Sequence, residues 1–152
     1  MASWAQFAAA NPELADHGRK LIYQFGIGLG YLATVAPDGF PRIHPFCPIV
    51  SGDGLYGFIL TGSPKCHDLE RDARCAVHTF SPQDVDDEFY VAARARRIDD
   101  PAMRERVNND YHAPSGDRSE ETLFEFDLIR AMGARYEARP SWPPAYTKWR
   151  AG

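Results

Sequence analysis

Hydrophobic and polar residues alternate over several short runs of the chain, and this period of two predicts strands with one buried face. The clearest run covers residues 123–138, where Phe124, Phe126 and Leu128 occupy every second position. Five other runs have the composition and length of strands: 32–35, 42–50, 55–61, 75–80 and 88–98. We therefore predict six strands.

Tight turns join the first three predicted strands. Residues 36–41, APDGFP, and residues 51–54, SGDG, combine proline, aspartate and glycine in the order that turns favour. These strands are therefore predicted to form an antiparallel meander. The middle strand contains Pro45 and Pro48, which cannot donate to a ladder, so it should lie at an edge, carry a bulge or turn toward a ligand.

Three segments carry the signals of helices. The first helix, over about 11–25, begins with Asn11 as N-cap and Pro12 at the first helical position, and its apolar residues follow at helical spacing. Two shorter helices are predicted at 64–72 and 102–109.

The order of these elements predicts the fold class. A parallel sheet needs a helix between most consecutive strands, and here the first three strands have only tight turns between them. Six strands with short connections and small helices instead predict a mainly β chain (α+β by count) that forms a closed or partly closed antiparallel barrel. We expect a single domain, 1–152, whose aromatic C-terminal tail, about 139–152, has no clear periodicity.

Composition narrows the classes of partner. The 152 residues have a formal net charge of −4 and an isoelectric point of about 5.7, which argues against nucleic-acid binding through bulk positive charge. No stretch has the apolar length of a membrane span, and the N-terminus lacks the pattern of a signal peptide. The three cysteines, Cys47, Cys66 and Cys75, form no CxxC pair. We therefore expect a cytoplasmic protein with no nucleic-acid or membrane partner and with reduced, packed thiols.

Two sequence patterns resemble known binding sites, but the predicted elements around them exclude both sites. GIGLG, at 26–30, has the glycines of a dinucleotide-binding loop, but that loop follows a strand and precedes a helix, and here the order is reversed. We interpret it as a helix stop. His44 and Cys47 are three residues apart on a predicted strand and point to opposite faces, so we expect no metal site there.

Arg42 and His44, two residues apart on the same strand, should share one face. Ile43 between them should then point into the core. Two side chains of this kind on a proline-bent strand could line a pocket, and plain solvent exposure is the competing interpretation.

The stretch TGSPK, at 61–65, is a candidate anion site. Ser63 suits the N-cap of the helix that follows, and Pro64 suits its first position. Lys65 lies in the first turn, where the helix dipole disfavours a cation unless an anion binds at the free N–H groups beside the Thr61 and Ser63 hydroxyls. A plain capped helix is the competing interpretation.

Three segments, taken in order, carry a family resemblance: GYLATVAPDGFPRIHPF (30–46), LYGFILTGSPKCHDLERDARCAVHTF (55–80) and FYVAARARRIDDPAMRERV (89–107). Together they resemble the flavin-binding split-barrel proteins related to pyridoxamine 5′-phosphate oxidase. The resemblance covers roughly 14–107 and, more loosely, the strand at 123–138. It implies a six-stranded antiparallel split β-barrel with short flanking helices, which forms a homodimer and binds FMN or a related deazaflavin at the subunit interface.

The resemblance also implies which residues meet the cofactor. The strand after the PDG turn contributes residues near the phosphate and the isoalloxazine ring, namely Arg42, His44 and Phe46. The end of the third strand and the start of the next helix contribute Phe58, Ile59, Thr61, Ser63 and Lys65. Arg42 and Lys65 suit a phosphate chemically, because both are cations with N–H donors.

The chain departs from the vitamin oxidase itself. Pro64 and Cys47 stand where that enzyme has basic residues, and its C-terminal Arg-Leu-His type of segment is not visible in RPSWPPAYTKWRAG (139–152). We therefore expect an FMN-binding oxidoreductase with a different, unknown small-molecule substrate. His44 is the best candidate for a catalytic residue.

Two other hypotheses stay open. One is a non-catalytic binding or carrier protein that holds flavin, deazaflavin or haem on the same fold, and the other is a dimeric relic with an empty cleft. The tail residues Trp142, Tyr146 and Trp149 would cover a pocket or the partner subunit, or would simply pack.

Overall fold

Eight strands and four helices make up the fold in the computed structural model, which describes residues 1–112, 116–136 and 143–152. The strands are β1 (Gly30–Val35), β2 (Pro41–Phe46), β3 (Ile49–Ser51), β4 (Gly54–Leu60), β5 (Arg74–Thr79), β6 (Glu88–Ile98), β7 (Glu121–Arg135) and β8 (Ala145–Arg150). The helices are α1 (Trp4–Ala10), α2 (Pro12–Ile22), α3 (Pro64–Arg71) and α4 (Pro101–Asn109).

The sheet is antiparallel throughout, in the order β2-β1-β5-β6-β7-β4-β3. The long strand β7 pairs with β4 through its first residues and with β8 through its last, while β6 runs along its other side. The predicted class, a mainly β antiparallel barrel with short helices, is confirmed. The predicted number of six strands is wrong, because β3 and β8 are separate strands.

The predicted meander is wrong at its middle strand. The run 42–50 divides at Cys47-Pro48, so that β2 pairs with β1 and β3 pairs with β4, at opposite ends of the strand order. The missing N–H of proline explains the break, and it also explains why both pieces lie at an edge, as predicted. Strand β8 was missed because its burial does not alternate: only Trp149 is half-buried.

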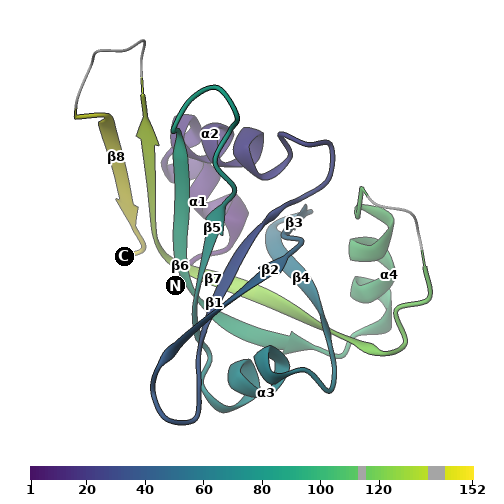
Figure 1. The fold of residues 1–152 in the computed structure, drawn as a ribbon. Coiled ribbons are helices and arrows are strands. Elements are labelled where there is room, and N and C mark those ends of the chain that lie inside the picture. Colours follow the sequence, from purple (N-terminus) through teal and green to yellow (C-terminus); the bar gives the residue numbers. More distant parts are fainter. Residues whose placement is uncertain (113–115, 137–142) are drawn as a thin grey trace.

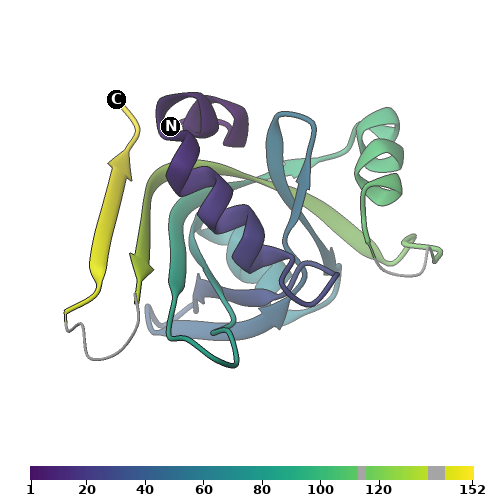
Figure 2. The ribbon, with the colours of Figure 1, turned by 90° about the horizontal axis from the view of Figure 1, so that it is seen from above.

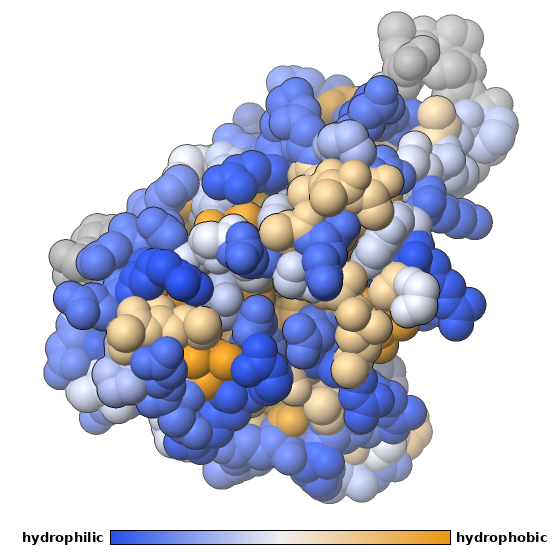
Figure 3. Space-filling view, turned by 180° about the vertical axis from the view of Figure 1, so that it is seen from behind, coloured by the Kyte–Doolittle hydropathy of each residue, from blue (hydrophilic) through white to orange (hydrophobic). Residues whose placement is uncertain are grey.

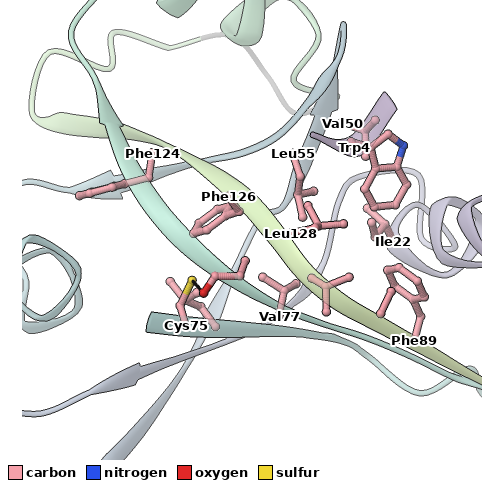
Figure 4. Close-up of a cluster of buried hydrophobic side chains, with 14 of the residues drawn as sticks. Trp4, Ile22, Val50, Leu55, Cys75, Val77, Phe89, Phe124, Phe126 and Leu128 are labelled. Atoms are coloured by element: carbon pink, nitrogen blue, oxygen red, sulfur yellow. Dashed lines mark hydrogen bonds between the residues drawn. The ribbon is translucent and has the colours of Figure 1, made fainter. Parts of the chain in front are cut away.

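The curled sheet encloses one main core. Figure 4 shows Leu55, Val77, Phe89 and Phe126, from four strands, gathered with Ile22 of α2. Phe126 points into this core, but the alternation predicted for the last long strand is wrong over its first half, because Leu123 and Glu125, of the other parity, are buried as well. Burial also raises the pKa of the Cys75 thiol to about 12, as expected of a thiol that packs in a core.

Strand β2, the first of the order, faces β7 and β4 across the barrel. The ring of Phe46 on β2 lies 5.9 Å from the ring of Phe126 on β7. A Cβ added to Gly57 of β4 would lie only 3.1 Å from the Phe46 ring, so the absent side chain leaves room for that ring. This close approach lets β2 and β4 face each other without pairing.

The helices cover the ends and one side of the sheet. Figures 1 and 2 show α1 and α2 together at one end, α3 at the other end beside the β1–β2 hairpin, and α4 to one side. Helix α2 starts at the predicted cap, where the Asn11 side chain accepts from the Leu14 N–H at 3.2 Å, but it ends three residues before the predicted end. The described part of the chain contains no helix with the length and apolar character to cross a membrane.

The surface seen from behind is mostly hydrophilic, with small hydrophobic groups between the polar residues (Figure 3). Trp149 of β8 belongs to the core side, because its ring lies 4.9 Å from that of Phe7. Tyr146 is exposed, and Trp142 lies outside the described residues.

Gly28, within the predicted helix stop, is the glycine at which an added Cβ would come closest to another atom. A Cβ at this position would lie 1.9 Å from the carbonyl oxygen of Pro48, in the break between β2 and β3. Gly26, two residues earlier, has the positive φ of 85° that glycine tolerates and other residues rarely adopt.

We predict that Gly28→Ala lowers the free energy of unfolding by at least about 2 kcal/mol, because the neighbouring atom belongs to the backbone and cannot rotate away. Urea denaturation measures the change. Gly62→Ala is the matched control, since a Cβ there meets no atom within 4 Å. Equal stability of Gly28→Ala and Gly62→Ala would contradict the close approach.

Candidate functional site

Helix α3 begins at the candidate anion site. The Ser63 hydroxyl accepts from the Cys66 N–H at 3.3 Å, and Pro64 occupies the first helical position, as predicted. Cys66 and Leu69 are buried and hold the helix against the barrel. Because the Ser63 oxygen only accepts in this cap, the hydroxyl proton remains available to a ligand.

Asp68 is the buried charge of α3, with 1% of its surface exposed. One carboxylate oxygen accepts from the Thr34 hydroxyl at 2.8 Å and lies 3.2 Å from a guanidinium nitrogen of Arg42. The other lies 3.2 Å from Arg71, which also donates to the backbone carbonyl of Val35. The carboxylate therefore joins β1, β2 and α3 at one point.

Strand β2 turns Arg42, His44 and Phe46 toward this junction and the barrel. Ile43 is 68% exposed, so the expectation that it points into the core is wrong. The reason is that Phe46, of the opposite parity, fills the core beside Phe126. Arg42 and His44 are consequently half-buried and are not simply exposed on the surface.

His44 has an open hydrogen-bonding position. Its Nε2 atom is buried and has no hydrogen-bond partner. Burial lowers the pKa of His44, and the positive charges of Lys65 and Arg42 lower it further, against the weaker opposite effect of Asp68. The imidazole is therefore neutral at neutral pH, and its Nε2 could donate or accept depending on the tautomer.

Lys65 connects the helix start to β2. Its Nζ atom donates to the Pro45 carbonyl at 3.4 Å, a long bond that leaves most of its donor capacity free. Arg42, His44, Ser63 and Lys65 thus form one group, here called the β2–α3 cluster. Two arginines, Arg42 and Arg71, pair with the single carboxylate of Asp68, so the junction carries an excess of positive charge, and Lys65 adds a further cation beside β2.

The other predicted cofactor residues lie elsewhere. Phe46 and Ile59 are packed inside the barrel core. Phe58 points to the opposite face of β4, where its ring lies between the guanidinium groups of Arg104 and Arg118, at 5.4 and 5.1 Å. Thr61 follows β4 and its hydroxyl lies 3.0 Å from that of Thr122. The structure therefore brings together four of the eight predicted residues.

Sequence reasoning missed Asp68, Thr34 and Arg71. The spacing of Asp68 and Arg71, three apart on a predicted helix, was a readable signal for an ion pair. The partnership of Asp68 with Thr34 and Arg42 depends on tertiary contacts and had no local signal.

A metal centre has little support in the described part of the chain. No three His, Cys, Asp or Glu side chains gather there in a way that could hold an ion. All three cysteines are free, Cys66 and Cys75 being buried and Cys47 half-buried.

Comparison with known proteins places the sequence in a family. The family described as pyridoxamine 5′-phosphate oxidase matches residues 22–139. No curated protein matches the sequence.

Solved structures share the fold at low sequence identity. A haem-binding protein from Mycobacterium smegmatis has a TM-score of 0.69 and 12% identity, over 88% of this chain and 57% of that one. This chain therefore spans little more than half of that protein. A Clostridium acetobutylicum protein of the pyridoxinephosphate oxidase family has a TM-score of 0.63 and 12% identity, over 96% and 95%. An F420 reductase has a TM-score of 0.56 and 21% identity, over 68% and 87%.

We predict that Asp68→Asn lowers the free energy of unfolding by about 2–3 kcal/mol, because it removes the charge that offsets two partly buried arginines. Thermal and urea unfolding measure the loss. Asp16→Asn is the control: Asp16 pairs with Lys20 at 2.7 Å on the exposed surface, where such pairs contribute little. A loss no greater than that of the control would show that Asp68 does not organise the junction.

Proposed function

The chain belongs to the pyridoxamine 5′-phosphate oxidase family, and we propose that it is an FMN-binding oxidoreductase acting on a small molecule still to be identified. A related deazaflavin is the closest alternative cofactor. When bound, the flavin supplies the chemistry of hydride transfer, and the protein supplies binding, orientation and electrostatics.

The observation that carries this proposal is the unpartnered Nε2 of His44 within the β2–α3 cluster. The charges of Lys65 and Arg42 both act on His44, Lys65 keeps free donors, and the Ser63 hydroxyl at the helix cap keeps a free proton two residues before Lys65. This set of donors suits a phosphate group, which accepts several charge-assisted hydrogen bonds. The cofactor phosphate would thus be held at the start of α3.

The same set favours an anion over a metal ion. A neutral histidine with an open nitrogen is also the form that binds haem iron. The cations of Lys65 and Arg42, however, repel a metal ion at that nitrogen and attract a phosphate. We therefore place haem behind flavin as the cofactor. A non-catalytic binding or carrier protein for flavin, deazaflavin or haem is the alternative function on this fold.

His44 is also our candidate for proton transfer, because its lowered pKa keeps it neutral and able to accept a proton at neutral pH. A histidine that binds the phosphate would instead act in cofactor binding. The effect of His44→Gln on cofactor affinity, compared with its effect on turnover, distinguishes these roles.

A homodimer is part of the proposal. Ile43 is 68% exposed, Phe40 in the adjoining turn 71% and Tyr31 of β1 43%, so the outward side of the β1–β2 hairpin carries large apolar groups. Apolar surface of this kind is typical of sites that another protein covers. A second copy is the proposed occupant, with the cofactor at the shared edge.

The absorption spectrum of the purified protein separates the cofactors. Flavin, deazaflavin and haem differ in their bands, and heating releases a non-covalent flavin for identification. A colourless protein that gains no thermal stability from FMN or a deazaflavin would count against both the oxidoreductase and the flavin carrier.

We predict that Lys65→Ala weakens FMN binding by about 1–3 kcal/mol, the range for a hydrogen bond to a charged group. Isothermal titration with FMN measures the affinity. Lys20→Ala is the matched control, because Lys20 pairs with Asp16 on α2, away from the cluster. Unchanged affinity in Lys65→Ala would remove Lys65 from the phosphate site.

A further inference from the structure

A buried negative charge lies beside a residue that is proposed to bind a phosphate. The carboxylate of Asp68 is buried, and one of its oxygens lies 3.2 Å from a guanidinium nitrogen of Arg42. Taken alone, this charge repels a phosphate that approaches Arg42. Removing a carboxylate from water also costs free energy. An aspartate at this place therefore needs a reason connected with Arg42.

The strand register shows how the carboxylate reaches Arg42. Thr34 of β1 and Arg42 of β2 are directly opposite each other, so their side chains lie on the same side of the sheet. One oxygen of Asp68 accepts the Thr34 hydroxyl at 2.8 Å, and the same oxygen pairs with Arg42. Helix α3 thus presents Asp68 to a single cross-strand pair of residues.

The second carboxylate oxygen is used by a different arginine. It accepts from Arg71, one turn later on α3, at 3.2 Å, and Arg71 also donates to the Val35 carbonyl at the end of β1. Hydrogen bonds therefore fix Arg71 at two points. The guanidinium of Arg42, by contrast, has the ion pair with Asp68 and no hydrogen bond to any of the described residues.

Arg42 consequently keeps its N–H donors for a ligand. Its side chain is 34% exposed, so these donors can be reached from the solvent. A long cationic side chain at the edge of a sheet otherwise samples many rotamers, and ordering it during binding costs free energy. Asp68 removes much of this cost in advance, because it holds Arg42 before any ligand arrives.

The surrounding charges make Arg42 dependent on Asp68. Arg71 shares the same carboxylate, and the positive charges of Lys65 and Arg42 both act on His44. Within residues 1–112, 116–136 and 143–152, Asp68 is the one carboxylate that pairs with Arg42. Without that carboxylate, repulsion from two neighbouring cations favours rotation of the Arg42 side chain out into water.

We propose that Asp68 is a positioning residue of the cofactor site, which holds Arg42 in the rotamer that binds the phosphate. Asp68 itself does not touch the phosphate, and its charge acts against an anion. This role rests on the proposed function, because it requires Arg42 to bind the cofactor. The hold of Asp68 on Arg42 in the free protein does not rest on it and is tested separately.

The variant Asp68→Asn has nearly the same shape and distinguishes positioning from a plain effect of charge, because the two predict changes of opposite sign. Removal of a mere negative charge would tighten FMN binding. Release of Arg42 weakens it, and we expect about tenfold weaker binding of FMN. Riboflavin, which has no phosphate, should bind the variant and the wild type equally. Isothermal titration at a temperature at which both proteins are folded measures these affinities.

His44 reports the position of Arg42 without any cofactor. The charge of Arg42 lowers the pKa of His44 and the charge of Asp68 raises it, and the effect of Arg42 is the larger one. Loss of Asp68 together with release of Arg42 therefore raises the pKa of His44, whereas loss of Asp68 with Arg42 still in place lowers it. In an NMR titration of the free Asp68→Asn protein, we expect a His44 pKa above that of the wild type.

Thr34→Val is the matched control for damage to the junction. It removes the hydrogen bond from the Thr34 hydroxyl to Asp68 but keeps the ion pair with Arg42. This variant should be less stable than the wild type and still bind FMN with nearly the wild-type affinity. An equal loss of FMN affinity in Thr34→Val and Asp68→Asn would mean that the damaged junction causes the loss, and the proposal would be wrong.

A double variant tests whether Asp68 acts through Arg42. Arg42→Gln should weaken FMN binding by itself, and adding Asp68→Asn to it should cause no further loss. Losses that add in the double variant would show that Asp68 acts by another route and would contradict the positioning role.

Two further results would overturn the proposal. One is an Asp68→Asn variant that binds FMN as tightly as the wild type or more tightly, and the other is a His44 pKa in that variant below the wild-type value. Failure of the wild type to bind FMN would instead refute the proposed function, and with it the role of Asp68 toward a cofactor. The His44 titration separates these cases, because it needs no FMN.

Discussion

The buried carboxylate of Asp68 is the interaction on which the candidate site depends. It accepts the Thr34 hydroxyl from β1, pairs with Arg42 from β2 and lies on α3, so it fixes three elements relative to one another. A buried charge is tolerated only when it is paired, and here Arg42 and Arg71 both pair with Asp68. Their charge exceeds that of Asp68, which leaves a net positive charge at this junction.

Much of the fold could be read from local patterns. The positions of Phe124, Phe126 and Leu128 predicted which side of β7 faces the main core, and the caps at Asn11 and Ser63 predicted two helix starts. Strand β8 gave no such signal, because nearly all of it is exposed. Helix α1 was not predicted although its sequence carries a local signal, since Ser3 and Gln6 form a capping box.

The candidate site was predictable only in part. Arg42, His44, Ser63 and Lys65 were identified from their residue types and a family resemblance, and the structure brings them together. The side of β2 that faces the core could not be predicted, because Ile43 and Phe46 are both apolar. Only the closure of the barrel decides which of the two is buried. The prolines gave a local signal for an edge or a bulge near Pro48, but the placement of β2 and β3 at opposite ends of the strand order depends on how the sheet closes.

The central claim is that the β2–α3 cluster binds the phosphate of a flavin, and His44 reports on it most directly. The pKa of His44 can be followed by NMR titration of its ring protons in the free protein, with FMN and with riboflavin, which has no phosphate. FMN should raise this pKa, because a nearby dianion favours the protonated imidazole, and riboflavin should leave it near its lowered value. An unchanged pKa and unchanged His44 resonances at saturating FMN would contradict the account.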